Sequence, residues 1–134
     1  FPTRRSSDLS STWNHTNHTP DWKNFLFISA FSGSFKEALN AGVIIGMGGD
    51  VGVYAHGQNA LEMKLMVEYG MKPIDVLKAA TSVNAKAFHL DQELGYLKPG
   101  YLSDIIIVKG NPAENIENTS NVVWVMKDGK VYKN

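Results

Sequence analysis

The sequence contains no cysteine among its 134 residues and has no excess of charge of either sign. Without cysteine, a disulfide framework and a thiolate metal site are both excluded. The 13 basic and 13 acidic residues give a formal net charge of zero, which leaves no basic field to attract nucleic acid or an anionic membrane. No apolar run is long enough to span a bilayer. We therefore expect neither nucleic acid nor a membrane among its partners.

The first nine residues, FPTRRSSDL, show neither helical nor strand periodicity. They can be encoded by a nucleotide string that resembles the end of a common short-read sequencing adapter. The alternative is a disordered N-terminal tail. We expect residues 1–9 to be such an adapter artefact. The natural chain would then begin near Ser10, with its N-terminal part missing.

The next segment, Ser10 to Pro20, is rich in small polar residues and predicts a loop. It contains His15 and His18, a spacing that could place two metal ligands on one helical face. No helix signal surrounds them, so we expect loop histidines in water. Residues 21–27 carry apolar side chains at helical spacing and predict a helix.

A helix followed by a buried strand is predicted between Ser34 and Ile45. Ser34 is a plausible N-cap with Glu37 as its capping-box partner, and Gly42 ends the helix. The apolar run Val43 to Ile45 does not alternate, which is typical of a strand buried on both faces. This order is the αβ half of a parallel α/β unit.

Three helical pieces are predicted after residue 58. Asn59 is expected to cap the first, with Glu62 at its third position and Gly70 at its end. Pro73 is expected to start the second, and residues 82–90 form the third. Helical spacing predicts inward-facing positions and a methionine cluster in the core: Leu61, Leu65, Tyr69, Ile74, Leu77 and Ala80, with Met63, Met66 and Met71.

The last forty or so residues predict four short β-strands. Asp104 to Val108 is a buried strand, and Asp128-Gly129 is the turn of a hairpin, in which Trp124 packs inward. Four short strands alone leave edges and an apolar face exposed. We expect their partners to come from the missing N-terminal part of the same chain.

Asp50 stands just beyond the Val43–Ile45 strand, after a glycine-rich stretch, and His56 follows it. Barrel enzymes keep their chemistry at this edge of their strands. Asp50 is therefore either a site carboxylate or a turn aspartate, and His56 either lines the site or is a loop histidine. The glycines fit neither a Rossmann nor a P-loop pattern, so a phosphate cradle is rejected. His89, at a helix end, is expected to be structural.

Four segments in order resemble the C-terminal end of the amidohydrolase superfamily, in its imidazolonepropionase-like and prolidase-like branch. They are AGVIIGMGGDVGVYAHGQNALEM, VEYGMKPIDVLKAATSVNAKAF, LGYLKPGYLSDIIIVKGNP and VVWVMKDGKVYKN. Together they fall between Ser34 and Asn134. Two departures are Gly49, where the family usually has Thr or Ser, and Ser103, where it usually has Ala.

The resemblance implies an α/β fold in which residues 10–90 form the last part of a TIM (β/α)8 barrel. Residues 91–134 would add strands to a small composite β-sandwich. It also implies a metal-dependent hydrolase of carbon–nitrogen bonds in an amide, cyclic amide or dipeptide. Asp50 would bind one or two divalent ions, zinc foremost, and shuttle the proton of the attacking water, while His56 would line the pocket for the small-molecule substrate.

No counterpart of the superfamily's His-x-His pair or modified lysine can be placed in the sequence. A catalytic zinc ion needs about three protein ligands. We therefore expect the chain alone to have no hydrolase activity and no tight zinc site. The competing hypothesis is a stand-alone α/β binding or interaction module without catalysis, which would need a complete core and a closed sheet.

Overall fold

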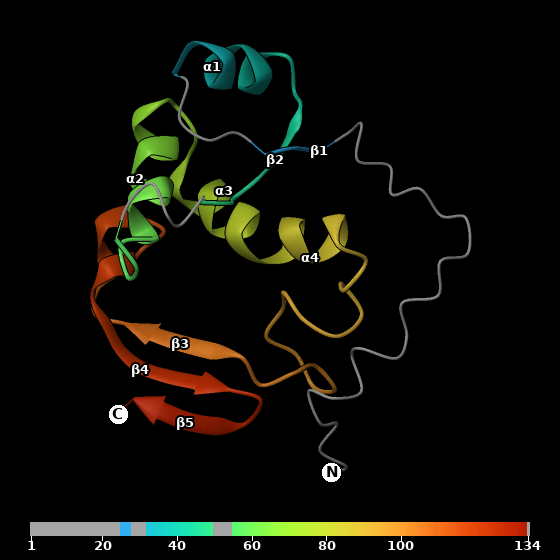
Figure 1. Ribbon diagram of the computed structural model, residues 1–134, viewed down its shortest axis with the longest axis vertical. Helices are drawn as coiled ribbons and strands as arrows, with labels where there is room; N and C mark the ends of the chain where they lie inside the picture. The colour runs from blue at the N-terminus through green and yellow to red at the C-terminus, as the bar shows by residue number, and fades with distance from the viewer. Residues whose placement is uncertain (1–24, 28–31, 50–54, 134) are drawn as a thin grey trace.

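Residues 25–27 form a β-strand, whereas the sequence predicted a helix over residues 21–27. The computed structural model describes residues 25–27, 32–49 and 55–133 (Figure 1). Strand β1 (Phe25–Phe27) pairs in parallel with β2 (Ile44–Gly46). The helix prediction was wrong for these three residues because a short apolar run fits either period. Pairing with β2 decides in favour of the strand.

Helix α1 (Ser32–Asn40) connects to β2 through a tight turn. It begins before the predicted start, so Ser34 lies inside the helix and is not its N-cap. Its end is as predicted: the N–H of Gly42 donates to Leu39 and that of Val43 to Ala38, which satisfies two carbonyls of the last turn. The chain therefore enters β2 directly from α1.

Strand β2 is buried on one side only, against the prediction of burial on both faces. Ile45 is 4% exposed and belongs to the core, whereas Ile44 is 46% exposed. Ile44 lines an open groove of about 380 Å³ between α1, β2 and α3. In the described part of the chain β1 is the only strand paired with β2.

Helix α2 (Ala60–Glu68) lacks the predicted capping box. Asn59 is at the N-cap position with helical backbone angles, φ −59° and ψ −26°, and its side chain makes no capping hydrogen bond. Glu62 is instead buried, with 9% of its surface exposed. The helix ends at Gly70 as predicted, with the N–H of Met71 donating to Met66 at 3.1 Å.

One continuous helical stretch runs from Pro73 to Ala87, where the sequence predicted two pieces. It consists of α3 (Pro73–Lys78), a π-helical turn η3 (Ala79–Val83) and α4 (Asn84–Ala87). Pro73 is at the first position, as predicted. His89 adopts φ 57° and the N–H of Leu90 donates to Ala85 at 2.8 Å, so His89 closes the stretch and has the expected structural role.

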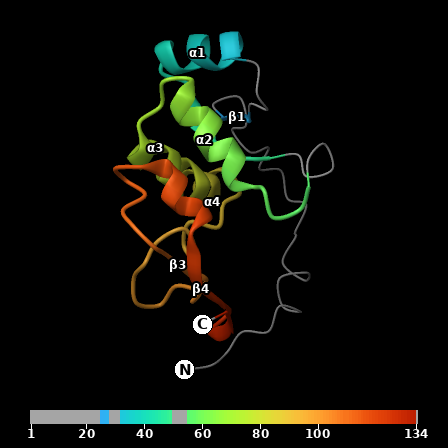
Figure 2. The same ribbon diagram turned by 90° about the vertical axis from the view of Figure 1, so that its left-hand side faces the viewer.

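The core lies between α1, β2, α2 and α3 and reaches the 3-10 helix η4 (Ile116–Ser120). Figures 1 and 2 show α1 at one end of the molecule, α2 to α4 in the middle and the C-terminal sheet at the other end. The predicted methionine cluster is confirmed: Met66 is buried, and Met63 and Met71 pack against the core. Leu61 and Ile74, predicted to face inward, are more than 40% exposed.

The C-terminal sheet has three antiparallel strands in the order β3–β4–β5, not the four that were predicted. They are β3 (Ile105–Val108), β4 (Val122–Lys127) and β5 (Lys130–Lys133). The hairpin at Asp128-Gly129 is confirmed, with φ 51° and 72° at its two residues, as a two-residue hairpin turn requires. Residues 94–100 form bends and turns and no strand. Gly95 and the Pro99-Gly100 pair, which favour turns, lie within this segment.

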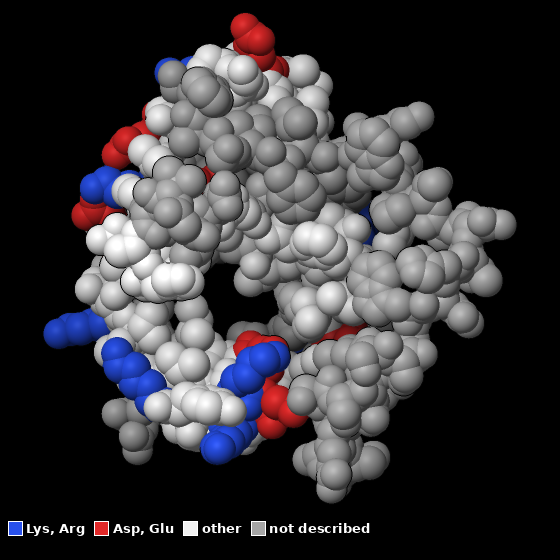
Figure 3. Space-filling view, viewed as in Figure 1, with Lys and Arg blue, Asp and Glu red and all other residues white. Residues whose placement is uncertain are grey.

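The sheet exposes apolar side chains on both of its faces. Ile106 and its cross-strand neighbours lie on one face, and Ile107 lies on the other, opposite the partly buried Trp124. Lysine side chains gather around this end of the molecule (Figure 3). Among the described helices, none is long and apolar enough to cross a membrane.

Candidate active site

The C-terminal edge of β2 is the place where the sequence predicts chemistry. Because β1 and β2 are parallel, both strands end at this same edge. Beyond it, Met47, Gly48 and Gly49 continue the chain. Asp50, the predicted metal ligand and proton shuttle, lies outside the described residues, as do His15 and His18. The described backbone therefore ends at Gly49, one residue before the predicted carboxylate.

His56, the predicted substrate-binding residue, lies in the turn between this edge and α2. The N–H of Gln58 donates to the carbonyl of Ala55 at 3.3 Å, which closes the turn around His56 and Gly57. The imidazole is exposed to solvent. An exposed ring on a turn that leads into a helix is compatible with both interpretations of His56 that the sequence left open.

The helical stretch Pro73–Ala87 is hydrogen-bonded to the C-terminal end of β2. The N–H of Met47 donates to the carbonyl of Ala79 at 3.4 Å. The side-chain amide of Asn84 donates to the carbonyl of Met47 at 2.6 Å. Sequence reasoning missed Asn84, although an asparagine within a predicted helical segment is a signal, because asparagine is disfavoured in helix interiors.

A metal ion would need more ligands than the described residues supply. In the segments 25–27, 32–49 and 55–133 no group of three or more His, Asp or Glu side chains is placed to hold an ion. A catalytic zinc ion takes about three protein ligands. The described residues therefore do not form a metal site by themselves.

The shifted pKa values of the described residues belong to structural contacts. Burial raises the pKa of Glu62 above its usual value. On the surface, the hydrogen bond and charge of the Lys64–Glu117 ion pair, at 2.9 Å, lower the pKa of Glu117 and raise that of Lys64. This pair joins α2 to η4 on the surface.

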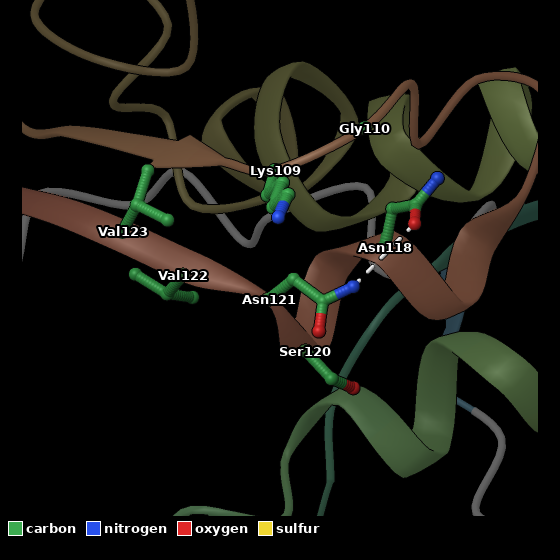
Figure 4. Close-up of a pocket in the computed structure, with 7 residues that line it drawn as sticks. All are labelled: Lys109, Gly110, Asn118, Ser120, Asn121, Val122 and Val123. Carbon is green, nitrogen blue, oxygen red and sulfur yellow. Dashed lines mark hydrogen bonds between the residues drawn. The ribbon is translucent and has the colours of Figure 1, made fainter.

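Another groove, larger than the one that Ile44 lines, lies away from the edge of β2. It is open, has a volume of about 610 Å³ and is formed by η4 and the start of β4 (Figure 4). Asn118 and Asn121 line it and are joined by a hydrogen bond of 3.5 Å. No buried charged side chain lines it. Its composition gives no reason to place chemistry there.

Comparison with known proteins identifies relatives over most of the chain. The model of the Amidohydrolase family matches residues 26–132. Ochratoxinase from Aspergillus niger is 35% identical over 105 residues, which cover 75% of this chain and 22% of that protein. Adenine deaminase from Mesorhizobium japonicum is 33% identical over 66 residues, covering 48% of this chain and 11% of that protein.

Solved structures give the same result. A Xaa-Pro dipeptidase with methionine bound in its active site matches with a TM-score of 0.75 and 42% identity, over 77% of this chain and 25% of that one. The crystal structure of A. niger ochratoxinase matches with a TM-score of 0.66 and 33% identity, over 77% and 24%. These neighbours indicate a TIM-barrel-type fold of which the chain covers a part.

The chain spans about a quarter or less of the length of the relatives named above. Those relatives are hydrolases of carbon–nitrogen bonds, and the superfamily typically uses divalent metal ions. The match covers both strands that end at the candidate site, the helices behind them and the C-terminal sheet. This chain belongs to the Amidohydrolase family.

Proposed function

We propose that this chain forms the C-terminal quarter of a metal-dependent hydrolase that cleaves a carbon–nitrogen bond in an amide, cyclic amide or dipeptide. The observation that carries the proposal is the family match over residues 26–132, which includes the edge of β2 directly before Asp50. The Xaa-Pro dipeptidase with 42% identity makes dipeptides the first substrates to test.

In this proposal residues 10–90 belong to the barrel and residues 91–134 to a β-sandwich subdomain. The parallel pair β1–β2, with α1 leading into β2, supports the first assignment. The antiparallel sheet β3–β4–β5 supports the second, because its two apolar faces need cover. Residues 1–9 stay a proposed adapter artefact on the ground of their sequence alone, and the family match begins at residue 26.

Asp50 is proposed as a metal ligand and as the group that moves the proton of the attacking water, and His56 as a substrate contact. Zinc is the proposed ion, with one or two bound. A divalent ion held there would acidify the attacking water and polarise the scissile carbonyl. Asp50 follows a strand end whose backbone is hydrogen-bonded to Ala79 and Asn84 of the helical stretch. Such a fixed backbone suits a carboxylate that must be positioned accurately.

The test uses the full-length protein that contains this sequence. Its metal content is measured by mass spectrometry, and its hydrolase activity is assayed on Xaa-Pro dipeptides, N-acyl amino acids and cyclic amides. We expect bound zinc and turnover of at least one class, both lost on chelation and restored by zinc. A metal-free protein inactive on every class would contradict the proposal.

A second experiment addresses the chain alone. Residues 10–134 are titrated with zinc by calorimetry, and their melting is followed. We expect no tight binding. Micromolar binding that Asp50→Ala abolishes would show that the chain holds a metal site without further sequence, and a cooperatively melting monomer would favour a stand-alone module.

A further inference from the structure

Asn84 makes the hydrogen bond that joins the helical stretch Pro73–Ala87 to the end of β2. Its Nδ2 donates to the carbonyl of Met47 at 2.6 Å across 37 positions of sequence, and the bond is partly buried. The N–H of Met47 is held by the carbonyl of Ala79, at 3.4 Å. Both polar backbone groups of Met47 are thus bound by one short piece of helix.

The side chain of Asn84 is energetically unfavourable at this position. Asparagine is disfavoured in helix interiors, and the Oδ1 of Asn84 is buried without a hydrogen-bond donor among the described residues. A buried polar atom without a partner destabilises a fold and calls for a functional or strain-related reason. An apolar side chain would have no such polar atom, but it could not donate to the Met47 carbonyl.

The helix is also built in an unusual way at this point. Asn84 directly follows the π-helical turn η3 (Ala79–Val83). A π-helical turn takes in one more residue than an α-helical turn, which rotates the residues that follow, and such turns are frequent at functional sites. The turn thereby determines which face of the helix Asn84 occupies.

The loop 94–100 supports this piece of helix from the side of the C-terminal sheet. A Cβ placed on Gly95 would lie 2.6 Å from the Cβ of Ala85 and 3.2 Å from the Cα of Ser82. Only a glycine allows the loop to pack this closely. This piece of helix therefore packs against the loop and is also hydrogen-bonded to the end of β2.

We propose that Asn84 is a positioning residue of the candidate site. Its amide fixes the Met47 carbonyl and with it the direction in which the chain leaves β2, three residues before Asp50 in the sequence. The inference rests on the proposed function, because it gives Asn84 a role in placing the carboxylate assigned there. Asn84 acts on the backbone and does not itself touch substrate or metal.

The test compares Asn84→Asp with Asn118→Asp in the full-length protein. Asn84→Asp keeps the shape of the side chain but replaces the donor with a carboxylate facing the Met47 carbonyl. Asn118, in η4, also donates through Nδ2 to a backbone carbonyl, that of Asn111 at 3.2 Å. The control therefore makes the same chemical change away from the site.

We expect Asn84→Asp to lower kcat about 10- to 100-fold, with KM changed less than threefold, in protein that remains folded. Hydrogen exchange of a peptide covering residues 44–49 should become faster, while peptides of the C-terminal sheet should not change. Asn118→Asp should leave kcat and the exchange of residues 44–49 unchanged. If Asn84→Asp fails to fold, Asn84→Ala removes the donor without adding charge and is measured in the same way.

Asp50→Asn is included to separate the two proposals. If it abolishes activity while the folded Asn84 variants keep kcat within twofold and exchange normally, the inference about Asn84 is wrong and the proposed function stands. If Asp50→Asn retains full activity, the role proposed for Asp50 fails, and the inference about Asn84 fails with it.

Discussion

The carboxylate of Asp104 accepts a hydrogen bond from the backbone N–H of Asp128, 2.7 Å away. The ammonium of Lys127 donates to the second oxygen of the same carboxylate. The start of β3 is thereby bound to the turn between β4 and β5. Partial burial by itself would raise the pKa of Asp104, but the bonds from Lys127 and Asp128, with the lysine charge, outweigh it and hold the pKa below its usual value.

This contact predicts a loss of stability in acid. Because the folded pKa of Asp104 lies below the unfolded value, its contribution is complete at neutral pH and disappears as the pH falls below about 4. Asp104→Asn should lower the free energy of unfolding by about 1–2 kcal/mol at pH 7, with a smaller difference at pH 3. Denaturant unfolding at both pH values checks this, with Glu114→Gln at an exposed site as the control. An equal loss at the two pH values would contradict it.

Glu62 predicts a pH dependence of the opposite sign. Burial raises its pKa, so the folded protein favours the protonated form. Stability should therefore fall as the pH rises above the usual range of a glutamate toward neutrality. Glu62→Gln should raise Tm at pH 7 and have little effect at pH 4. Glu68→Gln, exposed on the same helix, should show no such difference. A lower Tm for Glu62→Gln at pH 7 would indicate that the charge is stabilised by a contact.

The close packing of Gly95 against α4 predicts a strong effect of an added methyl group. Gly95→Ala would place a Cβ 2.6 Å from that of Ala85, at a backbone φ of +91°. The matched control is Gly100→Ala, at φ +90° with nothing within 4 Å of the added carbon. We expect about 1–2 kcal/mol of destabilisation for Gly100→Ala from the backbone alone, and about 1–3 kcal/mol more for Gly95→Ala from overpacking. Equal losses, measured by urea unfolding, would show that the loop moves away without cost.

Truncation of a buried side chain of α2 should lower the stability of the fold more than truncation of an exposed one. Met66 is 2% exposed in the core, whereas Leu61 on the same helix is 43% exposed. Met66→Ala should cost about 2–4 kcal/mol through lost contacts and a cavity. Leu61→Ala should cost less than half of that. Thermal unfolding of the two variants checks the order, and a larger loss for Leu61 would mean that residues beyond those described cover it.

Local signals in the sequence predicted the elements whose geometry is set locally. Asp128-Gly129 predicted the hairpin, Pro73 the start of α3 and Gly70 the end of α2, and each is confirmed. Such residues act through their own backbone angles or missing donor, so they do not depend on distant partners. The strand before Asp50 was also predicted, because its apolar run is bounded by glycine on both sides.

The predictions that failed depended on what the segment packs against. Residues 25–27 become a strand because β2 offers its edge, which three apolar residues cannot reveal. Helix α2 packs against α3 and against η4, which lies more than 45 positions later, and its buried side includes Glu62 in place of Leu61. The bond from Asn84 to Met47 spans 37 positions. Long-range contacts of this kind leave no periodic pattern in the sequence.

The roles proposed for Asp50 and His56 predict different kinetic defects in the full-length protein. Removing a group that moves a proton in the transition state lowers kcat, by about 10²- to 10⁴-fold, so Asp50→Asn should lower kcat by that factor. Removing a substrate contact made equally in ground and transition states raises KM and leaves kcat, so His56→Ala should raise KM several-fold. His89→Ala is the control, because His89 is exposed and closes a helix. Steady-state kinetics with zinc saturating would contradict both roles if His56→Ala and His89→Ala behaved alike and Asp50→Asn remained within tenfold of the unaltered protein.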